Sequence, residues 1–240
     1  MSISLKDAVH EQAKSDVDAL IATTRQEMVP ITHELEIGLV ALDDSVQDIF
    51  QAYEMADIVG VLSGVKPAAL LGEDNIGTGR FSEELPRALQ LMGLTAQKIS
   101  SNAVAVSRHP EIVHELSCYY DRRFGDNTEA AHYGIGKCLG YPVSATEYFL
   151  RRLPTLFGDD ELPIVRPLSG GDERYFHQFV LSPGHYQEEI DTYAKPLREA
   201  VELMAPNTYR TILEHNKHKV GRAAVKGQAS FAPLALSSRS

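Results

Sequence analysis

The chain has 240 residues, of which 43% are hydrophobic and 23% charged, and its formal net charge is −10. These values are typical of a globular protein with a sizeable core, and the acidic balance argues against nucleic-acid binding, which needs clustered Lys and Arg. The N-terminus has no apolar signal segment and no apolar run approaches ~18 residues, so we expect a cytoplasmic protein without membrane contact.

The first hundred residues alternate helical patterns with short apolar runs, which favours a small β/α unit. In chain order, the sequence predicts a helix over 4–28, a strand over 35–42 with a helix as the alternative, a helix over 46–62 with Gly64 after it, a strand over 68–71, a helix over 82–92 and a strand over 94–106. We therefore expect a β/α region with an N-terminal helix over residues 1–108.

The second half of the chain is predicted to be helical. Its expected elements are helices over 110–122, 128–139, 141–152, 182–204 and 206–218, with a long connection over 153–171 and a kink at Pro196. The expected fold class is therefore α+β and helix-rich, with a small β/α N-terminal part followed by a helical region over 109–219. Residues 220–240 are rich in Ala, Ser and Gly and basic, which predicts a flexible tail.

Two Glu-x-x-His motifs, Glu111 to His114 and Glu129 to His132, resemble in spacing the ligands of di-iron carboxylate sites. Positions i and i+3 share a helical face, so both side chains can reach one metal. However, a short turn should make the two helices antiparallel, and both motifs lie near helix starts. At ~1.5 Å per residue the motifs are then more than ~10 Å apart, so we assign no metal ligand.

A narrower cluster of reactive side chains lies in the same two helices. His114 and Cys118 are four residues apart, and Arg122 continues their face, while Glu129, His132 and Lys137 lie on the next helix. A single soft metal, or His132 acting as general base near Lys137, is compatible with these residues. The alternative is a partly buried histidine that bonds to a neighbour. The two cysteines, Cys118 and Cys138, suit a reducing compartment.

The run from His132 to Pro142 places Gly134 and Gly136 inside a helix, where each costs ~1 kcal/mol relative to Ala. Such glycines indicate a close approach of the backbone to another helix or to a ligand. Lys137 beside Gly136 is similar to part of a phosphate loop, but the Walker spacing is missing and no strand precedes it. Close packing between helices is therefore the favoured interpretation.

Charge and histidine placement add further candidates. Residues 101–154 carry six basic and six acidic residues, so the rest of the chain carries the whole net charge of −10. The pairs Arg122-Arg123 and Arg151-Arg152 could hold an anion, or each arginine could pair with a local carboxylate. His177 and His185 flank Ser182-Pro183, where they could form a pocket wall or cap a helix.

Gly140-Tyr141-Pro142, followed by Phe149 and by the stretch from Phe176 to Pro183, resembles an uncharacterised prokaryotic family with a G-Y-P-x-C-C motif. Ser144 and Ala145 stand where that family has its cysteine pair. The resemblance implies that any metal or redox chemistry of those cysteines is lost in this chain, and it implies no activity.

Our leading interpretation is an enzyme that acts on a small anionic or amino-acid-like metabolite, at a pocket formed by the helices of residues 109–154. The candidate catalytic residues are His132, Lys137 and Tyr141, and the candidate substrate-binding residues are Arg122, Arg123, Gly134 and Gly136. The sequence identifies no cofactor. The alternatives are a non-catalytic interaction protein, whose glycine-bearing helices contact a partner or a second copy, and a metal-dependent oxidase.

Overall fold

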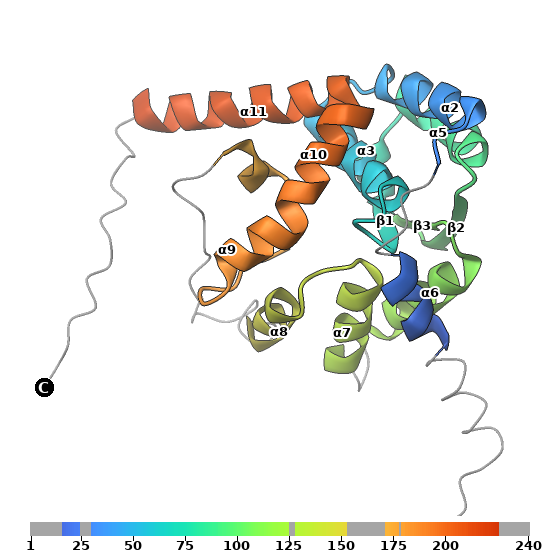
Figure 1. The fold of residues 1–240 in the computed structure, drawn as a ribbon, viewed down its shortest axis with the longest axis vertical. Helices are drawn as coiled ribbons and strands as arrows, with labels where there is room; N and C mark the ends of the chain where they lie inside the picture. The colour runs from blue at the N-terminus through green and yellow to red at the C-terminus, as the bar shows by residue number, and fades with distance from the viewer. Residues whose placement is uncertain (1–15, 25–29, 125–127, 153–170, 178, 226–240) are drawn as a thin grey trace, which may run out of the picture.

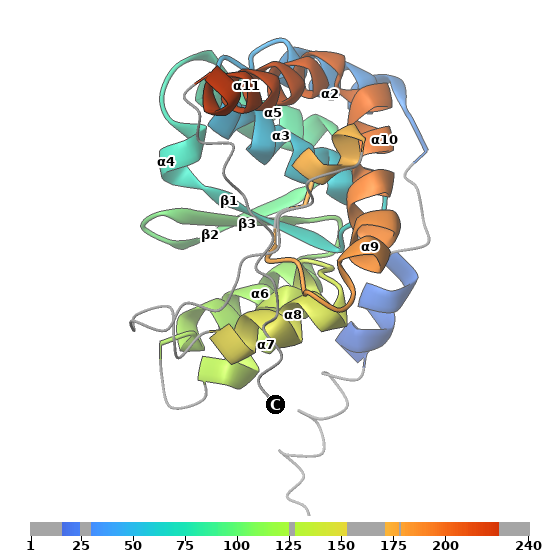
Figure 2. The same cartoon turned by 90° about the vertical axis from the view of Figure 1, so that its left-hand side faces the viewer.

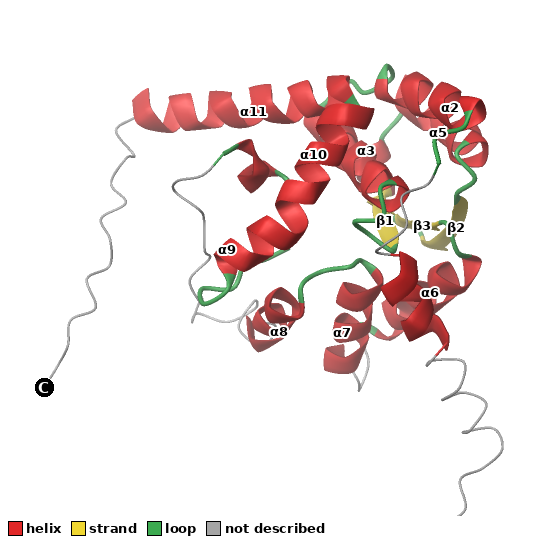
Figure 3. Cartoon of the chain, in the orientation of Figure 1, coloured by secondary structure: helices red, strands yellow, loops and turns green. Residues whose placement is uncertain are grey.

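The computed structural model describes residues 16–24, 30–124, 128–152, 171–177 and 179–225, and for 218–225 only the backbone (Figure 1). The fold is helix-rich α+β, as expected: a small antiparallel sheet in the N-terminal half is surrounded by helices, and the C-terminal half is helical. Figure 3 shows how little of the described chain is strand. None of the described helices is both long and apolar enough to cross a bilayer.

Helices fill the N-terminal part up to residue 62. Residues 16–24 are helical, in agreement with the expected first helix, whose residues 4–15 and 25–28 lie outside the described ranges. α2 (His33–Asp43) begins after Thr32, whose hydroxyl accepts a hydrogen bond from the Leu35 backbone N–H. The strand expected over 35–42 is therefore wrong. A short apolar run fits either period, and the cap at Thr32 together with burial of Leu35, Leu39 and Leu42 on one face selects the helix.

The expected helix over 46–62 is confirmed as α3 (Ile49–Leu62). Asp48 caps it by accepting hydrogen bonds from the backbone N–H groups of Phe50 and Gln51. α3 is buried almost all round, because it lies between the sheet and the C-terminal helices. The short α4 (Glu73–Ile76) and α5 (Arg80–Leu91) follow β1 in the chain, and α5 packs against α2.

Three strands form the sheet of the described chain, in the order β1-β3-β2 with antiparallel pairing throughout. β1 (Ala68–Gly72) confirms the strand expected over 68–71. The strand expected over 94–106 is two strands, β2 (Thr95–Ser100) and β3 (Ala103–Ser107), joined as a hairpin. The sequence pattern missed this turn because Ser100 to Asn102 carries no glycine or proline.

The sheet has helices on both faces, so the molecule has three layers (Figure 2). Alternate residues of β3 face opposite layers: Val104 and Val106 contact the α3 side, and Ala105 contacts the α6 side. α6 (Pro110–Arg122) covers the second face, α7 (Thr128–Cys138) packs on α6, and α8 (Val143–Arg152) packs on α7. The cluster beneath that face also includes Ile21 of the first helix.

The last third of the described chain returns to the first layer. It contains η2 (Asp172–Tyr175), α9 (Tyr186–Glu189), the π-helical turn η3 (Ile190–Ala194), α10 (Lys195–Met204) and α11 (Pro206–Val225). Pro196 was expected to kink or divide the helix over 182–204, and the structure has the π-helical turn η3 immediately before α10, with Pro196 in the first turn of α10, where a proline is tolerated. α11 extends beyond the expected end at residue 218. The connection over 153–170 and the tail from 226 lie outside the described residues.

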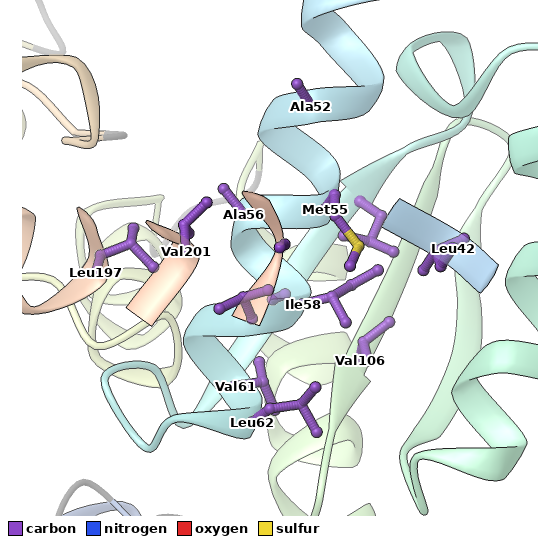
Figure 4. Close-up of a cluster of buried hydrophobic side chains, with 14 of the residues drawn as sticks. Leu42, Ala52, Met55, Ala56, Ile58, Val61, Leu62, Val106, Leu197 and Val201 are labelled. Atoms are coloured by element: carbon purple, nitrogen blue, oxygen red, sulfur yellow. The ribbon is translucent and has the colours of Figure 1, made fainter. Parts of the chain in front are cut away.

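The main hydrophobic core contains residues from both the N-terminal and the C-terminal part of the described chain (Figure 4). Met55, Ile58 and Leu62 of α3 pack toward the Val106 side, and Ala56 of α3 lies toward Leu197 and Val201 of α10. All of these side chains are buried. The C-terminal helices thus complete the core that begins in the N-terminal part.

Candidate functional site

A cavity of about 360 Å³ lies between α7, α8 and the segment around residues 177–180. Its walls are mostly apolar and aromatic, with a few polar groups, which is the usual chemistry of a small-molecule site. The described lining residues are His132, Ile135, Gly136, Tyr141, Ala145, Thr146, Phe149, His177, Phe179 and Val180. Figure 1 shows α7 and α8 side by side, with the chain leading into α9 next to α8.

His132 enters the cavity from α7, and its ring contacts Phe149 of α8 with centroids 5.5 Å apart. The ring lies near Arg123, so that both the backbone carbonyl and the charge of Arg123 act on its pKa. Burial lowers the pKa of His132 below its ordinary 6.5, the positive charge of Arg123 lowers it further, and the carbonyl opposes both. The imidazole is therefore neutral at pH 7, and its unprotonated nitrogen carries a lone pair that can accept a proton.

His177 lines the same cavity from the segment that follows η2. Its Nδ1 lies 3.1 Å from the carbonyl oxygen of Phe179, which fixes Nδ1–H as the donor. Burial lowers the pKa of His177 below 6.5, and the Phe179 carbonyl and the charge of Glu189 act in the opposite direction. The interpretation of His177 as part of a pocket wall is thus confirmed, whereas His185 lies at the exposed start of α9.

Tyr141 is positioned by the end of α7. Gly140 has a positive φ of 76°, and the Tyr141 N–H donates to the Gly136 carbonyl at 2.9 Å, as in a Schellman C-cap. Only glycine adopts this backbone conformation without strain, so Gly140 sets the direction in which the chain leaves the helix. The Tyr141 ring then packs 5.2 Å from Phe179 and 5.9 Å from Tyr193, between centroids.

A buried group of charges lies next to Tyr141. Lys66 is fully buried, forms an ion pair with Asp57 of α3, and places its Nζ 5.7 Å from the centroid of the Tyr141 ring. Burial raises the pKa of Tyr141, and the negative charges of Asp57 and Glu54 raise it further. The phenol therefore stays protonated and remains a hydrogen-bond donor across the physiological range.

Glu54 lies one helical turn before Asp57 and is 5% exposed. Its Oε1 accepts hydrogen bonds from Asn75 Nδ2 at 2.6 Å and from the Gly72 backbone N–H at 3.2 Å. Burial, reinforced by the charge of Asp57, raises the pKa of Glu54 to about 7, against the lowering effect of these bonds and of Lys66. Glu54 thus links the end of β1 and the short helix α4 to α3 through hydrogen bonds.

Sequence reasoning missed Glu54, Asp57 and Lys66. The available signal was the pair Glu54-x-x-Asp57 in the otherwise apolar segment 49–62, since a fully buried helix carries charge only where a partner is supplied. Gly60 was a second signal. A Cβ on Gly60 would lie 2.7 Å from Cδ of Lys66, so this glycine makes room for the buried lysine stem.

Gly134 and Gly136 are sites of close helix packing. A Cβ on Gly134 would approach the Tyr119 ring of α6 to 2.5 Å, and one on Gly136 would approach Thr146 Oγ1 of α8 to 2.7 Å. Three helices thus pack through these two positions, which agrees with the favoured interpretation. Gly136 also lines the cavity, beside Thr146.

The basic candidates are not among the described residues that line the cavity, although the Arg123 charge acts on His132. Lys137 forms an ion pair with Asp18 of the first helix and lines a neighbouring cavity of about 220 Å³, which shares the wall residues Tyr141 and Thr146 with the first cavity. Arg123 stacks on the rings of Tyr120 and Phe124, 3.5 and 4.4 Å from their centroids, and exposed Arg122 faces a groove between α6 and the first helix. The cavity lining therefore contains His132, Tyr141 and Gly136 of the expected site, while the side chains of its three cations lie outside that lining.

The two Glu-x-x-His motifs also face different surroundings. His114 lines the groove beside the first helix, with Cys118 Sγ 3.8 Å from its Nε2, whereas His132 lines the cavity. Burial and the charge of Glu115 raise the pKa of Cys118, so its thiolate is disfavoured. Within the described ranges, His, Cys, Asp and Glu side chains do not form a group of three or more arranged for a metal ion.

Glu189, which the sequence did not point to, connects two walls of the cavity. Its carboxylate is 1% exposed and accepts hydrogen bonds from Ser144 Oγ at 2.7 Å, Ser182 Oγ at 2.6 Å and the Ser182 N–H at 2.9 Å. Ser144 belongs to α8 and Ser182 follows the segment that carries His177 and Phe179. The segments 141–149 and 179–182 are thus adjacent in space.

Comparison of the chain with models of protein families, with curated proteins and with solved structures found no match.

Proposed function

We propose that this protein is an enzyme that transfers protons to or from a small molecule bound in the cavity between α7 and α8, with His132 as the acid/base. One observation carries the proposal: two imidazoles, His132 and His177, line a single cavity, and burial lowers the pKa of each, which favours the neutral ring. His177 bonds through Nδ1 to the Phe179 carbonyl, so its Nε2 can exchange a proton with a ligand, and a neutral His132 ring can do the same through its unprotonated nitrogen.

Tyr141 has a supporting role in this proposal. Its raised pKa keeps the hydroxyl protonated, so it can donate a hydrogen bond to an oxygen on which negative charge develops. Lys137, Arg122 and Arg123 lie outside the cavity and have no part in it. We place the enzyme in the cytoplasm, where a reducing environment suits its free cysteines, Cys118 and Cys138.

The test begins with a ligand-observed NMR screen of small molecules, followed by incubation of each hit with the protein and mass spectrometry of the products. His132→Gln should lower turnover of a converted hit by about 10²- to 10⁴-fold, the usual contribution of a positioned acid/base, and change its binding only slightly. His114→Gln, on the exposed face of α6, is the matched control. Unchanged turnover in the His132 variant would refute the proposal.

The pH dependence provides a second readout of the same proposal. If His132 acts as a base, kcat/KM should fall as the pH drops through its folded pKa, which lies below 6.5. The fall should be absent from the residual activity of His132→Gln. A profile that is identical in both proteins would assign the titration to another group.

A further inference from the structure

We infer that the cavity selects an uncharged molecule that carries a flat aromatic ring and a hydrogen-bonding substituent. This inference concerns the ligand of the proposed enzyme and therefore rests on the proposed function. It differs from the sequence-based expectation of an anionic or amino-acid-like metabolite, and its evidence is the composition of the cavity walls.

Aromatic rings dominate the walls. Phe149, Phe179 and Tyr141 all line the cavity. Tyr193, on the π-helical turn η3, packs edge-on against Phe179 at 4.9 Å and 83°, and lies 5.9 Å from Tyr141, which holds both rings in place. Fixed rings offer a flat ligand offset-stacked or edge-to-face contacts, which add to the affinity beyond burial alone. A saturated ring is buried in the same way but does not form these aromatic contacts.

The described walls carry no formal charge at neutral pH. The two histidines are neutral because burial lowers the pKa of each. The cations nearby have other contacts: Lys66 pairs with Asp57, Lys137 pairs with Asp18, and Arg123 stacks on the rings of Tyr120 and Phe124. An anion that entered the cavity would lose its hydration, and the described lining contains no Lys or Arg side chain to pair with it, which is unfavourable.

The polar groups of the cavity suit a neutral substituent. The imidazoles of His132 and His177 and the hydroxyl of Tyr141 supply acceptors and donors, while the Thr146 hydroxyl donates to the Pro142 carbonyl at 3.1 Å. An amide, a hydroxyl group or a ring N–H can both donate and accept, and so can pair with such a set. A volume of about 360 Å³ lies at the small end of ligand sites, which fits one or two fused rings.

Three small probes separate the properties in question. Benzamide is uncharged and aromatic, benzoate has nearly the same shape but is anionic, and cyclohexanecarboxamide is uncharged but not flat. Affinities would be measured from the shifts of the histidine Cε1–H signals in ¹H–¹³C NMR spectra of the full chain. We expect benzamide to bind at least about tenfold more tightly than either relative, and to move the signals of His132 and His177.

Substitution of a wall residue tests the aromatic contribution. Phe179→Leu should reduce the preference for benzamide over cyclohexanecarboxamide at least threefold, and Phe149→Leu, on α8, should act in the same direction. Phe50→Leu is the control, since Phe50 is 60% exposed on α3 and away from the cavity. Both wall variants keep an apolar side chain, and the unchanged amide dispersion in their spectra verifies folding.

The inference is overturned if benzoate binds as tightly as benzamide, if cyclohexanecarboxamide does so, or if no probe moves the two histidine signals up to its solubility limit. Failure of the inference is distinguishable from failure of the proposed function. A charged or saturated substrate whose turnover needs His132 would remove only the inference, whereas the expected ranking of probes with His132-independent turnover would remove only the function.

Discussion

At the scale of single residues, Glu54 makes the stability of the protein depend on pH. Its folded pKa of about 7 lies above the ordinary 4.5, so the folded state holds the proton more tightly than the unfolded chain. The sign follows from linkage: this contribution is fully present below pH 4.5, declines as the pH rises toward 7 and is lost above it. The physical reason is that Glu54 must ionise while it is buried, where its negative charge is poorly solvated.

Glu54→Gln removes this titration and keeps an oxygen for Asn75 and Gly72. Relative to the wild type, the variant should gain about 2–3 kcal/mol in unfolding free energy between pH 4.5 and 8. Urea denaturation at several pH values measures the difference, with Glu83→Gln, an exposed carboxylate on α5, as the control for net charge. A difference that stays constant with pH would contradict the assignment.

At the scale of elements, the Glu189 carboxylate joins Ser182, at the end of the cavity wall of residues 179–182, to Ser144 of α8. Three donors converge on two oxygens that are shielded from water, so loss of the acceptor leaves buried donors without a partner. α9 contributes Glu189 and the adjoining π-helical turn contributes Tyr193, so one short stretch positions both the wall and the aromatic rings behind it.

Replacement of Glu189 should therefore loosen this wall without unfolding the molecule. In Glu189→Gln, one acceptor oxygen becomes a donor that faces other donors, and we expect about 1–3 kcal/mol of destabilisation with faster hydrogen exchange of the Ser182 amide. The neighbouring Glu188→Gln is the control, because the Glu188 side chain is 73% exposed. Equal exchange rates in the two variants would show that Glu189 does not hold the wall.

At the scale of the whole molecule, α10 and α11 pack on α3 and complete the main core. We therefore expect the sheet and the C-terminal helices to unfold together, although the sequence divided the chain into regions 1–108 and 109–219. Because the two parts share a core, unfolding of one part exposes buried apolar residues of the other and destabilises it.

Leu197→Ala tests this cooperation. Leu197 is fully buried on α10, so its truncation should cost about 2–5 kcal/mol and speed hydrogen exchange in β1 by the same factor as in α10. Leu203→Ala, 79% exposed on the same helix, should change the unfolding free energy by less than about 0.5 kcal/mol. Persistent protection of β1 while α10 exchanges would indicate two separately folding units.

Several elements could be predicted from local pattern alone. The predicted helices that correspond to α3, α6, α7 and α8 have caps, a proline or a glycine at their ends and apolar residues at helical spacing. These signals depend only on residues that are close together in the sequence. The strand prediction for residues 35–42 was wrong because a short apolar run is compatible with both the helical and the strand period. The β2–β3 hairpin was not predicted because its turn, Ser100 to Asn102, has no glycine or proline to mark it within a run of strand-forming residues.

The residues of the candidate site also fall into those that the sequence indicated and those that it did not. His132, Gly136 and Tyr141 were found because an unusual run of residues, 132–142, marks them in sequence, and the helix packing at Gly134 and Gly136 was expected from their cost in a helix. His177 was noted only as a wall residue. Lys137, Arg122 and Arg123 were grouped with His132 by closeness in sequence. Lys137 is five positions from His132 on α7 and so points in a different direction, while Arg122 and Arg123 lie at the end of α6, outside the cavity lining.

The sequence by itself determined that this protein is a helix-rich α+β fold and that the stretch after residue 128 is unusual. Both follow from composition, period and caps, which act over a few residues. Only the tertiary structure decided that His132 and His177 share a cavity, that Glu189 joins Ser144 to Ser182, and that Lys66 lies buried beside Asp57. These contacts depend on how the layers pack, because packing brings together residues that are far apart in the chain.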